Sequence, residues 1–162
     1  MKSLRTALAA ALLASPFAAA AHHDGDVVQL SQIAVSHAWT EETGDMAHGV
    51  DVFLTIANEG EAPVRLIAAD TGFTEPGVFQ TPVVAEDGAL AIREVPAIEI
   101  APGQTITFQP GGLRISLGNA QRVHDAGDHF HMTLEFEGAG EMEIDVEVER
   151  RDDARTAEEP AT

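Results

Sequence analysis

The feature that most constrains the fold is a strict alternation of apolar and polar residues near the end of the chain. In residues 129–137 and again in residues 141–149, every second side chain is apolar, and the side chains between them are His, Thr, Glu or Asp. Gly138 and Gly140 separate the two segments. Because successive side chains of a β-strand point to opposite faces, this pattern predicts two antiparallel strands with one buried and one solvent-facing side.

Shorter segments with the same period precede this pair. They cover residues 50–57, 64–68, 98–100, 105–108 and 113–117, and turn sequences such as Pro110-Gly111-Gly112 divide them. Short alternating strands with turns every 8–12 residues or so predict an all-β fold, an antiparallel sandwich or barrel, with no long helix between the first and last of these strands. The side chains expected inside it are Phe53, Leu66, Phe108, Leu117, Phe130, Leu134, Phe136, Ile144 and Val146.

The beginning of the chain has the pattern of a secretory signal peptide. Two cations precede a short apolar run, residues 6–14, which is too short to span a bilayer. Small residues of the A-x-A kind follow and predict cleavage after Ala20 or Ala21, so residues 1–21 form the signal peptide. The alternative is a buried N-terminal helix. We therefore expect a soluble protein exported to the periplasm, with no direct membrane insertion.

The rest of the chain predicts one small, strongly acidic domain. Residues 22–149 have the length of a single domain with its own core, whereas residues 150–162 lose the alternation and predict a disordered acidic tail. The formal net charge is -18, and it becomes -20 once Lys2 and Arg5 leave with the signal peptide. Such a field repels nucleic acid and anionic lipid and attracts cations and basic protein faces, although high acidity can also serve solubility alone. The chain has no cysteine, so a metal site would use histidine, methionine or carboxylate.

Several strand ends and turns form a recognisable series. They are Ala38-Trp39 and residues 56–60, 64–66, 98–103, 108–112, 127–128 and 133–136. Over residues 30–149 this series resembles the PCu(A)C family of periplasmic copper chaperones. The resemblance implies a cupredoxin-like Greek-key β-sandwich that binds Cu(I) and helps deliver copper to a respiratory oxidase.

The copper ligands of that family are missing from their usual places. The resemblance puts a His and a nearby Met in residues 80–84, a further Met around Leu90 or Ile92, and a His-x-Met at residues 114–116. Here residues 80–84 read Gln-Thr-Pro-Val-Val and residues 114–116 read Arg-Ile-Ser. No family ligand can be carried over, and the guanidinium of Arg114 would oppose a cation at this place. We therefore expect that copper does not bind at the family position.

A His-x-His pair near the end of the chain is the first candidate for a relocated site. His129 and His131 are two positions apart, so they share one face of a strand and can chelate Cu(II) or Zn(II). His124 or Asp128 from the preceding loop could supply a third ligand. The alternative is two solvent-exposed histidines on a polar face without a metal.

The N-terminus after signal cleavage is the second candidate. Cleavage after Ala20 leaves a free amine with His23 as the third residue, an arrangement that can wrap Cu(II) in a square plane. Cleavage after Ala21 makes His22 the first residue, whose amine and imidazole can hold one copper as in a histidine brace. Either cut supplies nitrogen ligands that suit Cu(II).

Met46 and His48 are the third candidate pair. Both are in phase with the apolar residues of the strand that begins near residue 50, so we expect them to face the core side at the mouth of the sandwich. There they could bind a soft metal ion or simply pack. Met132 and Met142 are in phase with the core, and packing is their expected role. His37 has no visible partner, and we expect it to be structural.

Three functions are compatible with these features. The first is a copper-binding chaperone or buffer for Cu(II) and/or Cu(I), with a relocated His-rich site, that passes copper to a membrane oxidase or another copper carrier. The second is a metal-free interaction or assembly module with the same fold. The third is a copper oxidase or oxygenase built on a histidine brace. The sequence contains no Ser/His/Asp arrangement, no phosphate loop and no paired-carboxylate pattern, so we favour a protein that is not an enzyme and, within that class, the first function.

Overall fold

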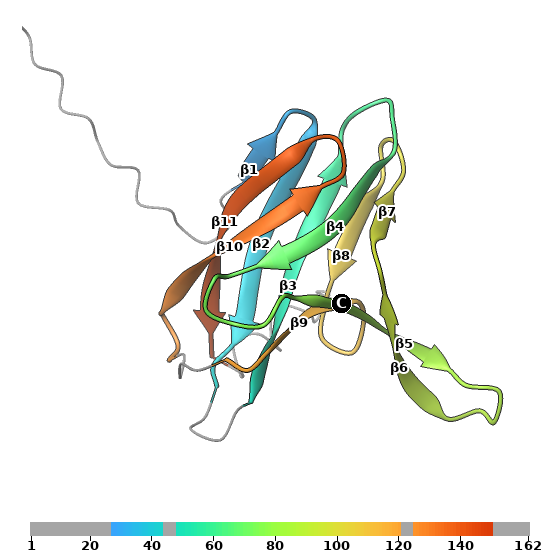
Figure 1. Ribbon diagram of the computed structural model, residues 1–162, viewed down its shortest axis with the longest axis vertical. Coiled ribbons are helices and arrows are strands. Elements are labelled where there is room, and N and C mark those ends of the chain that lie inside the picture. The colour runs from blue at the N-terminus through green and yellow to red at the C-terminus, as the bar shows by residue number, and fades with distance from the viewer. Residues whose placement is uncertain (1–26, 44–47, 121–124, 151–162) are drawn as a thin grey trace, which may run out of the picture.

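The computed structural model describes residues 27–43, 48–120 and 125–150. In these ranges the chain consists of strands, turns and loops and contains no helix (Figure 1). The strands are β1 (Val27–Leu30), β2 (Ile33–Glu41), β3 (Gly49–Asn58), β4 (Val64–Asp70), β5 (Val78–Val84), β6 (Leu90–Val95), β7 (Ile98–Ile100), β8 (Thr105–Phe108), β9 (Arg114–Gly118), β10 (His129–Phe136) and β11 (Gly140–Glu149). The prediction of an all-β domain is confirmed. No helix in the described ranges is long and apolar enough to cross a membrane.

The strands belong to one hydrogen-bonded sheet that folds over its own core. Its order is β6-β5-β9-β3-β2-β11-β10-β4-β7, with β1 added to β2 and β8 added to β3. Neighbouring strands are antiparallel except β11 and β2, which run parallel. In Figure 1, the layer formed by β10, β11 and β4 crosses in front of β3 and β8. The apolar sides of these two layers face each other.

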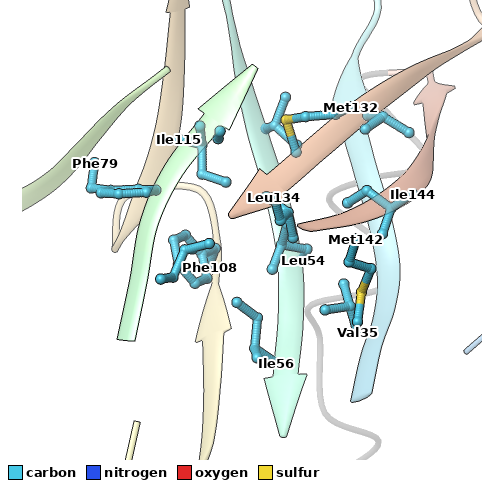
Figure 2. Packing of buried hydrophobic residues seen from close by; sticks show 14 of the residues in the cluster. Val35, Leu54, Ile56, Phe79, Phe108, Ile115, Met132, Leu134, Met142 and Ile144 are labelled. Carbon is cyan, nitrogen blue, oxygen red and sulfur yellow. The ribbon is translucent and has the colours of Figure 1, made fainter. Parts of the chain in front are cut away.

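The apolar side of each alternating strand forms the core. All nine side chains that the sequence places inside are buried. Figure 2 shows side chains from β3, β8 and β10, among them Leu54, Phe108 and Leu134, converging in one cluster. Burial of one such side chain contributes about 1.5–3 kcal/mol, which is why the alternation decides the face that turns inward. Phe53 is buried on the opposite side of β3, where its ring centroid lies 4.7 Å from that of Trp39.

One buried polar side chain secures the junction where β3 ends. Asn58 is 2% exposed, and its Nδ2 donates to the carbonyl oxygens of Ala62 at 2.8 Å and Ile100 at 3.0 Å. Its Oδ1 accepts a hydrogen bond from the backbone N–H of Gly60 at 3.0 Å. The turn that follows β3 is thereby tied to the end of β7, which explains in physical terms why asparagine occupies this position.

Strands β5 and β6 are not predicted by the alternation. They form a hairpin that projects from the body of the domain (Figure 1). Phe79 at its base is buried, but Val84 at its far end is 70% exposed. Because the outer half of the hairpin does not pack on the core, no period of two is imposed on its sequence.

Candidate metal centre

The outer face of β10 presents the His-x-His pair. The antiparallel register of β10 and β11 places His129 opposite Glu147 and His131 opposite Asp145. Both histidines are exposed. Met132 follows His131 on the other face of the strand, in phase with Phe130 and Leu134, and is fully buried. The two imidazoles therefore lie on one face, with Cα atoms about 6.6 Å apart along the strand. Met132 and Met142 pack in the core, as expected from their phase.

A carboxylate on the neighbouring strand contacts the second histidine. Nδ1 of His131 lies 2.8 Å from Oδ1 of Asp145. This oxygen is buried and has no hydrogen bond of good geometry in the described part of the chain, and the imidazole of His131 is the polar group that lies beside it. If Nδ1 faces the carboxylate, Nε2 is the nitrogen available to a metal ion. Asp145 is not among the residues predicted from sequence. A signal for it exists, because a tight turn at Gly138–Gly140 between two alternating strands sets a register in which Asp145 lies opposite His131.

The surroundings of the two histidines are strongly acidic. Glu141, Glu143 and Glu147 alternate along β11 on the same face, and Glu135 lies directly opposite Glu141. Like charges opposite each other destabilise a strand pair by up to about 1 kcal/mol. A bound cation would reduce this repulsion, and the field of the face raises the local concentration of cations.

His37 has a partner that the sequence does not reveal. The pairing of β2 with β3 shifts by one residue between Ser36 and Trp39, and His37 at this bulge has a φ of 49°. Its ring stacks on Trp39 with centroids 6.0 Å apart, and its Nε2 lies 3.2 Å from Oε1 of Glu149. Because the two residues are 112 positions apart, no local pattern could indicate this contact. It links the bulge of β2 to the end of β11.

Among the residues that the structure describes, no other predicted ligand completes a group of three with His129 and His131. His48 precedes β3 and is exposed, so it does not pack in the core. The ladder with β9 begins only at the pair Gly49 and Gly118, and His48 lies outside the pairing that would fix its direction. Within the described ranges, no group of three or more histidines and carboxylates is arranged to hold a metal ion. The candidates His22, His23, Met46 and His124 lie outside the described residues.

Two of the stretches to which the resemblance assigns family ligands, around Gln80 and at residues 114–116, meet where β5, β9 and β3 adjoin. Gln80 is paired with Arg114, and Val78 is paired with Ser116. Nη2 of Arg114 donates to Oε1 of Gln80 at 3.0 Å, and Nε of Arg114 lies 3.3 Å from Oδ2 of Asp51. The side chain of Arg114 is only 18% exposed. A guanidinium with a carboxylate beside it is therefore built into this junction.

Comparison with known protein families finds one family model that matches most of this chain. A family model described as lipoprotein LpqE-like matches residues 33–148, from the start of β2 into the last strand. This chain belongs to the LpqE-like family. No curated protein sequence matches it.

Solved PCuAC domains have the fold of this LpqE-like chain. The copper-bound PCuAC domain from PmoF2 is 25% identical with a TM-score of 0.67, and the match covers 77% of this chain and 98% of that domain. The apo PCuAC domain from PmoF1 is 26% identical with a TM-score of 0.67, covering 77% and 99%. The Cu(I) form of DR1885 from Deinococcus radiodurans shares the fold at 19% identity and a TM-score of 0.58, covering 70% and 76%. The predicted likeness to copper-chaperone domains is confirmed for the fold.

Proposed function

We propose that this LpqE-like protein is a periplasmic copper-binding protein, a chaperone or buffer, with its copper site on the outer face of β10. The observation that supports this proposal is the pair of exposed histidines, His129 and His131, each opposite a carboxylate of β11. A PCuAC domain with the same fold has been solved with copper bound. The cargo is Cu(II) and/or Cu(I).

The chemistry of the pair suits copper. Neutral imidazole is a good ligand for Cu(II), and a carboxylate on the second ring nitrogen orients the ring and makes it a better donor. Asp145, at 2.8 Å from Nδ1 of His131, has the place of such a carboxylate. Two imidazoles alone make a weak site. A tight site requires further ligands.

Those further ligands come, in this proposal, from segments on either side of the described domain. Signal cleavage after Ala20 or Ala21 creates an amine next to His22 and His23, and His124 precedes β10 in the chain. Met46 and His48 remain a separate candidate pair. The amine and imidazoles would complete a nitrogen set typical of Cu(II), whereas a methionine would favour Cu(I).

The arrangement around Arg114 supports a relocated site. A metal ion at the family position would have to displace a guanidinium that hydrogen bonds to Gln80 and pairs with Asp51. Coulomb repulsion between the two cations disfavours binding there. We propose that the family's ligand position has been replaced by this internal ion pair.

The partners follow from the same surface. An acidic exported domain would receive copper ions and pass them to a copper-receiving membrane oxidase or another copper carrier, by contacts with basic surfaces on those proteins. Nucleic acid and direct membrane insertion are excluded from the proposal on grounds of charge. The proposed role is to bind copper and transfer it, and it does not include catalysis.

Competition titration with Cu(II) and Cu(I) tests the proposal. Three forms are compared: the chain beginning at residue 21 or 22, the same chain with an N-terminal extension, and the double variant His129→Ala/His131→Ala. If the two sites converge, either change should weaken copper binding far more than twofold. His37→Gln is the matched control, since it removes an exposed histidine outside the candidate set. Equal affinity in all four proteins contradicts the proposal.

A second candidate function is a metal-free interaction module with the same sandwich. It is favoured by one observation, the Arg114–Asp51 pair at the family position. The titration distinguishes the two functions, because a metal-free module leaves copper with the competitor in every form.

A further inference from the structure

The β5–β6 hairpin gathers most of the large apolar side chains that the described residues leave in solvent. Val84, Leu90 and Ile92 are 70%, 82% and 52% exposed, and the remaining side chain of this kind is Val27 on β1. The register pairs Val84 with Leu90 and Pro82 with Ile92, so these four side chains share one face of the hairpin. Figure 1 shows the hairpin projecting away from the two layers of the domain. An apolar face on a projecting hairpin indicates an interaction surface.

The outer edge of β6 is open to another strand. At the turn, the N–H of Ala85 donates to the carbonyl oxygen of Ala89 at 2.8 Å. Hydrogen-bonded and non-hydrogen-bonded pairs alternate along an antiparallel ladder, so the backbone groups of Leu90 and Ile92 point away from β5. β6 is the last strand in the order of the sheet. Its outward N–H and C=O groups therefore present a template for strand pairing.

The opposite edge of the hairpin is protected. β5 pairs with β9 only from Val78 to Gln80, so its outer half has no strand partner on that side among the described residues. By the same alternation, the backbone nitrogen of Pro82 points to this edge, and proline has no N–H to donate. Proline on an edge strand is a common protection against pairing. β6 contains no proline, so the unprotected apolar edge is confined to β6.

We infer that the edge of β6 is a dimer interface in which the β6 strands of two copies pair antiparallel. Placing Leu90 of one copy opposite Ile92 of the other aligns their outward backbone groups as hydrogen-bonded pairs and sets the two copies of Ala91 against each other at the two-fold axis. The same register places Arg93, the hairpin's one cation, opposite Ala89 of the other copy and next to its acidic turn, and it brings Glu94 to the same turn. Apolar contact and backbone pairing are thus both satisfied in one register. This inference does not depend on copper binding.

Charge argues against a membrane as the occupant of this edge. The turn contains Glu86 and Asp87, so an anionic membrane is repelled. A second copy brings both Arg93 and Glu94 to that turn, so apolar contact and backbone pairing are what favour it. The projection of the hairpin also keeps the acidic faces of β10 and β11 apart, because those strands lie on the far side of β9, β3 and β2 in the sheet order. The interface is small and the chain has a formal charge of -18, so we expect a weak dimer that tightens when salt screens the net repulsion.

Sedimentation equilibrium of the mature chain tests this inference from about 10 µM to 1 mM protein at about 0.3 M NaCl. A monomer–dimer equilibrium is expected. Ile92→Pro removes an outward N–H while leaving the β5–β6 ladder intact, and Ile92→Lys removes the apolar contact; each should raise the dimer Kd roughly tenfold or more. Val27→Lys makes the matched change at an exposed apolar residue of β1 and should leave Kd unchanged. A monomer at every concentration, or a dimer that both Ile92 variants leave intact, overturns the inference.

Cross-linking tests the register itself, because the chain has no cysteine of its own. In the proposed pairing the two Ala91 Cα atoms lie about 4.5 Å apart, within the range of a disulfide. Ala91→Cys should therefore form a covalent dimer with oxidised glutathione. Ala89→Cys, on the same side of the same strand, lies opposite Arg93 of the other copy, about 13 Å from its equivalent, and should remain monomeric. Equal cross-linking of the two variants contradicts this register.

Discussion

Replacing Asn58 with alanine is expected to lower the free energy of unfolding by about 2–4 kcal/mol. The side chain makes three hydrogen bonds, two as donor to the carbonyl oxygens of Ala62 and Ile100 and one as acceptor from Gly60. Each bond contributes about 1 kcal/mol net, and a buried acceptor left without its donor adds to the loss. The carbonyl of Ile100 is such an acceptor, because its bond to Asn58 is buried.

Urea unfolding followed by the fluorescence of Trp39, the single tryptophan, measures this loss. Thermal unfolding is a second measure of the same loss. For a domain of this size the expected fall in Tm is about 8–16 °C, at about 4 °C per kcal/mol. Asn58→Asp keeps the shape but replaces the donor with an acceptor that faces two carbonyl oxygens, so it should be less stable than Asn58→Ala. Glu59→Ala, an exposed neighbour in the same turn, should change the free energy by less than about 0.5 kcal/mol.

The comparison of the two Asn58 variants can refute this reasoning. If Asn58→Asp unfolds at the same urea concentration as Asn58→Ala, or at a higher one, donation by Nδ2 does not hold the junction together. The same conclusion follows if Asn58→Ala has the stability of Glu59→Ala.

Three further predictions concern the core, a close contact and the internal ion pair. Met132→Ala should lower the free energy of unfolding by about 2–5 kcal/mol and leave copper affinity unchanged, since this side chain is fully buried; a loss of copper binding in the folded variant would make Met132 a ligand. Gly77→Ala should cost about 1–3 kcal/mol in urea unfolding, because its Cβ would lie 2.8 Å from Cγ2 of Ile115, and an unchanged midpoint would contradict this packing. Arg114→Leu should cost about 1 kcal/mol by leaving Asp51 without its cation, and should not alter the Cu(II) affinity of the mature chain; altered affinity would place copper at the family position.

The sequence predicts the fold best where a strand separates core from solvent. Along β10 and β11 the alternation is uninterrupted, and the buried and exposed faces are as predicted. Phe53 shows a limit of the same rule, since it is buried on the opposite side of β3 from Leu54. The hairpin of β5 and β6 lacks the pattern because its outer half projects from the core formed by the described residues.

The candidate site is less predictable because it depends on contacts between distant segments. The shared face of His129 and His131 follows from a spacing of two. The contact of Asp145 with His131 requires the register of two strands, and that of His37 with Glu149 requires a bulge and a parallel pairing. His48 shows a further limit, because the alternation does not fix the direction of a residue that precedes the first residue of the strand, Gly49.

Parallel pairing of β2 with β11 ties the last strand of the domain to one of its first. Until β11 is available, the stretch of β2 from Trp39 to Glu41 lacks its neighbour on that side, and the core lacks every apolar side chain that β11 supplies. Native contacts of such long sequence separation form late and slowly. For a chain that we propose is exported, this means that a segment emerging first cannot lock into the finished sandwich while the end of the chain is still being made. The polypeptide would thus remain unfolded enough for translocation and complete its fold only on the far side of the membrane.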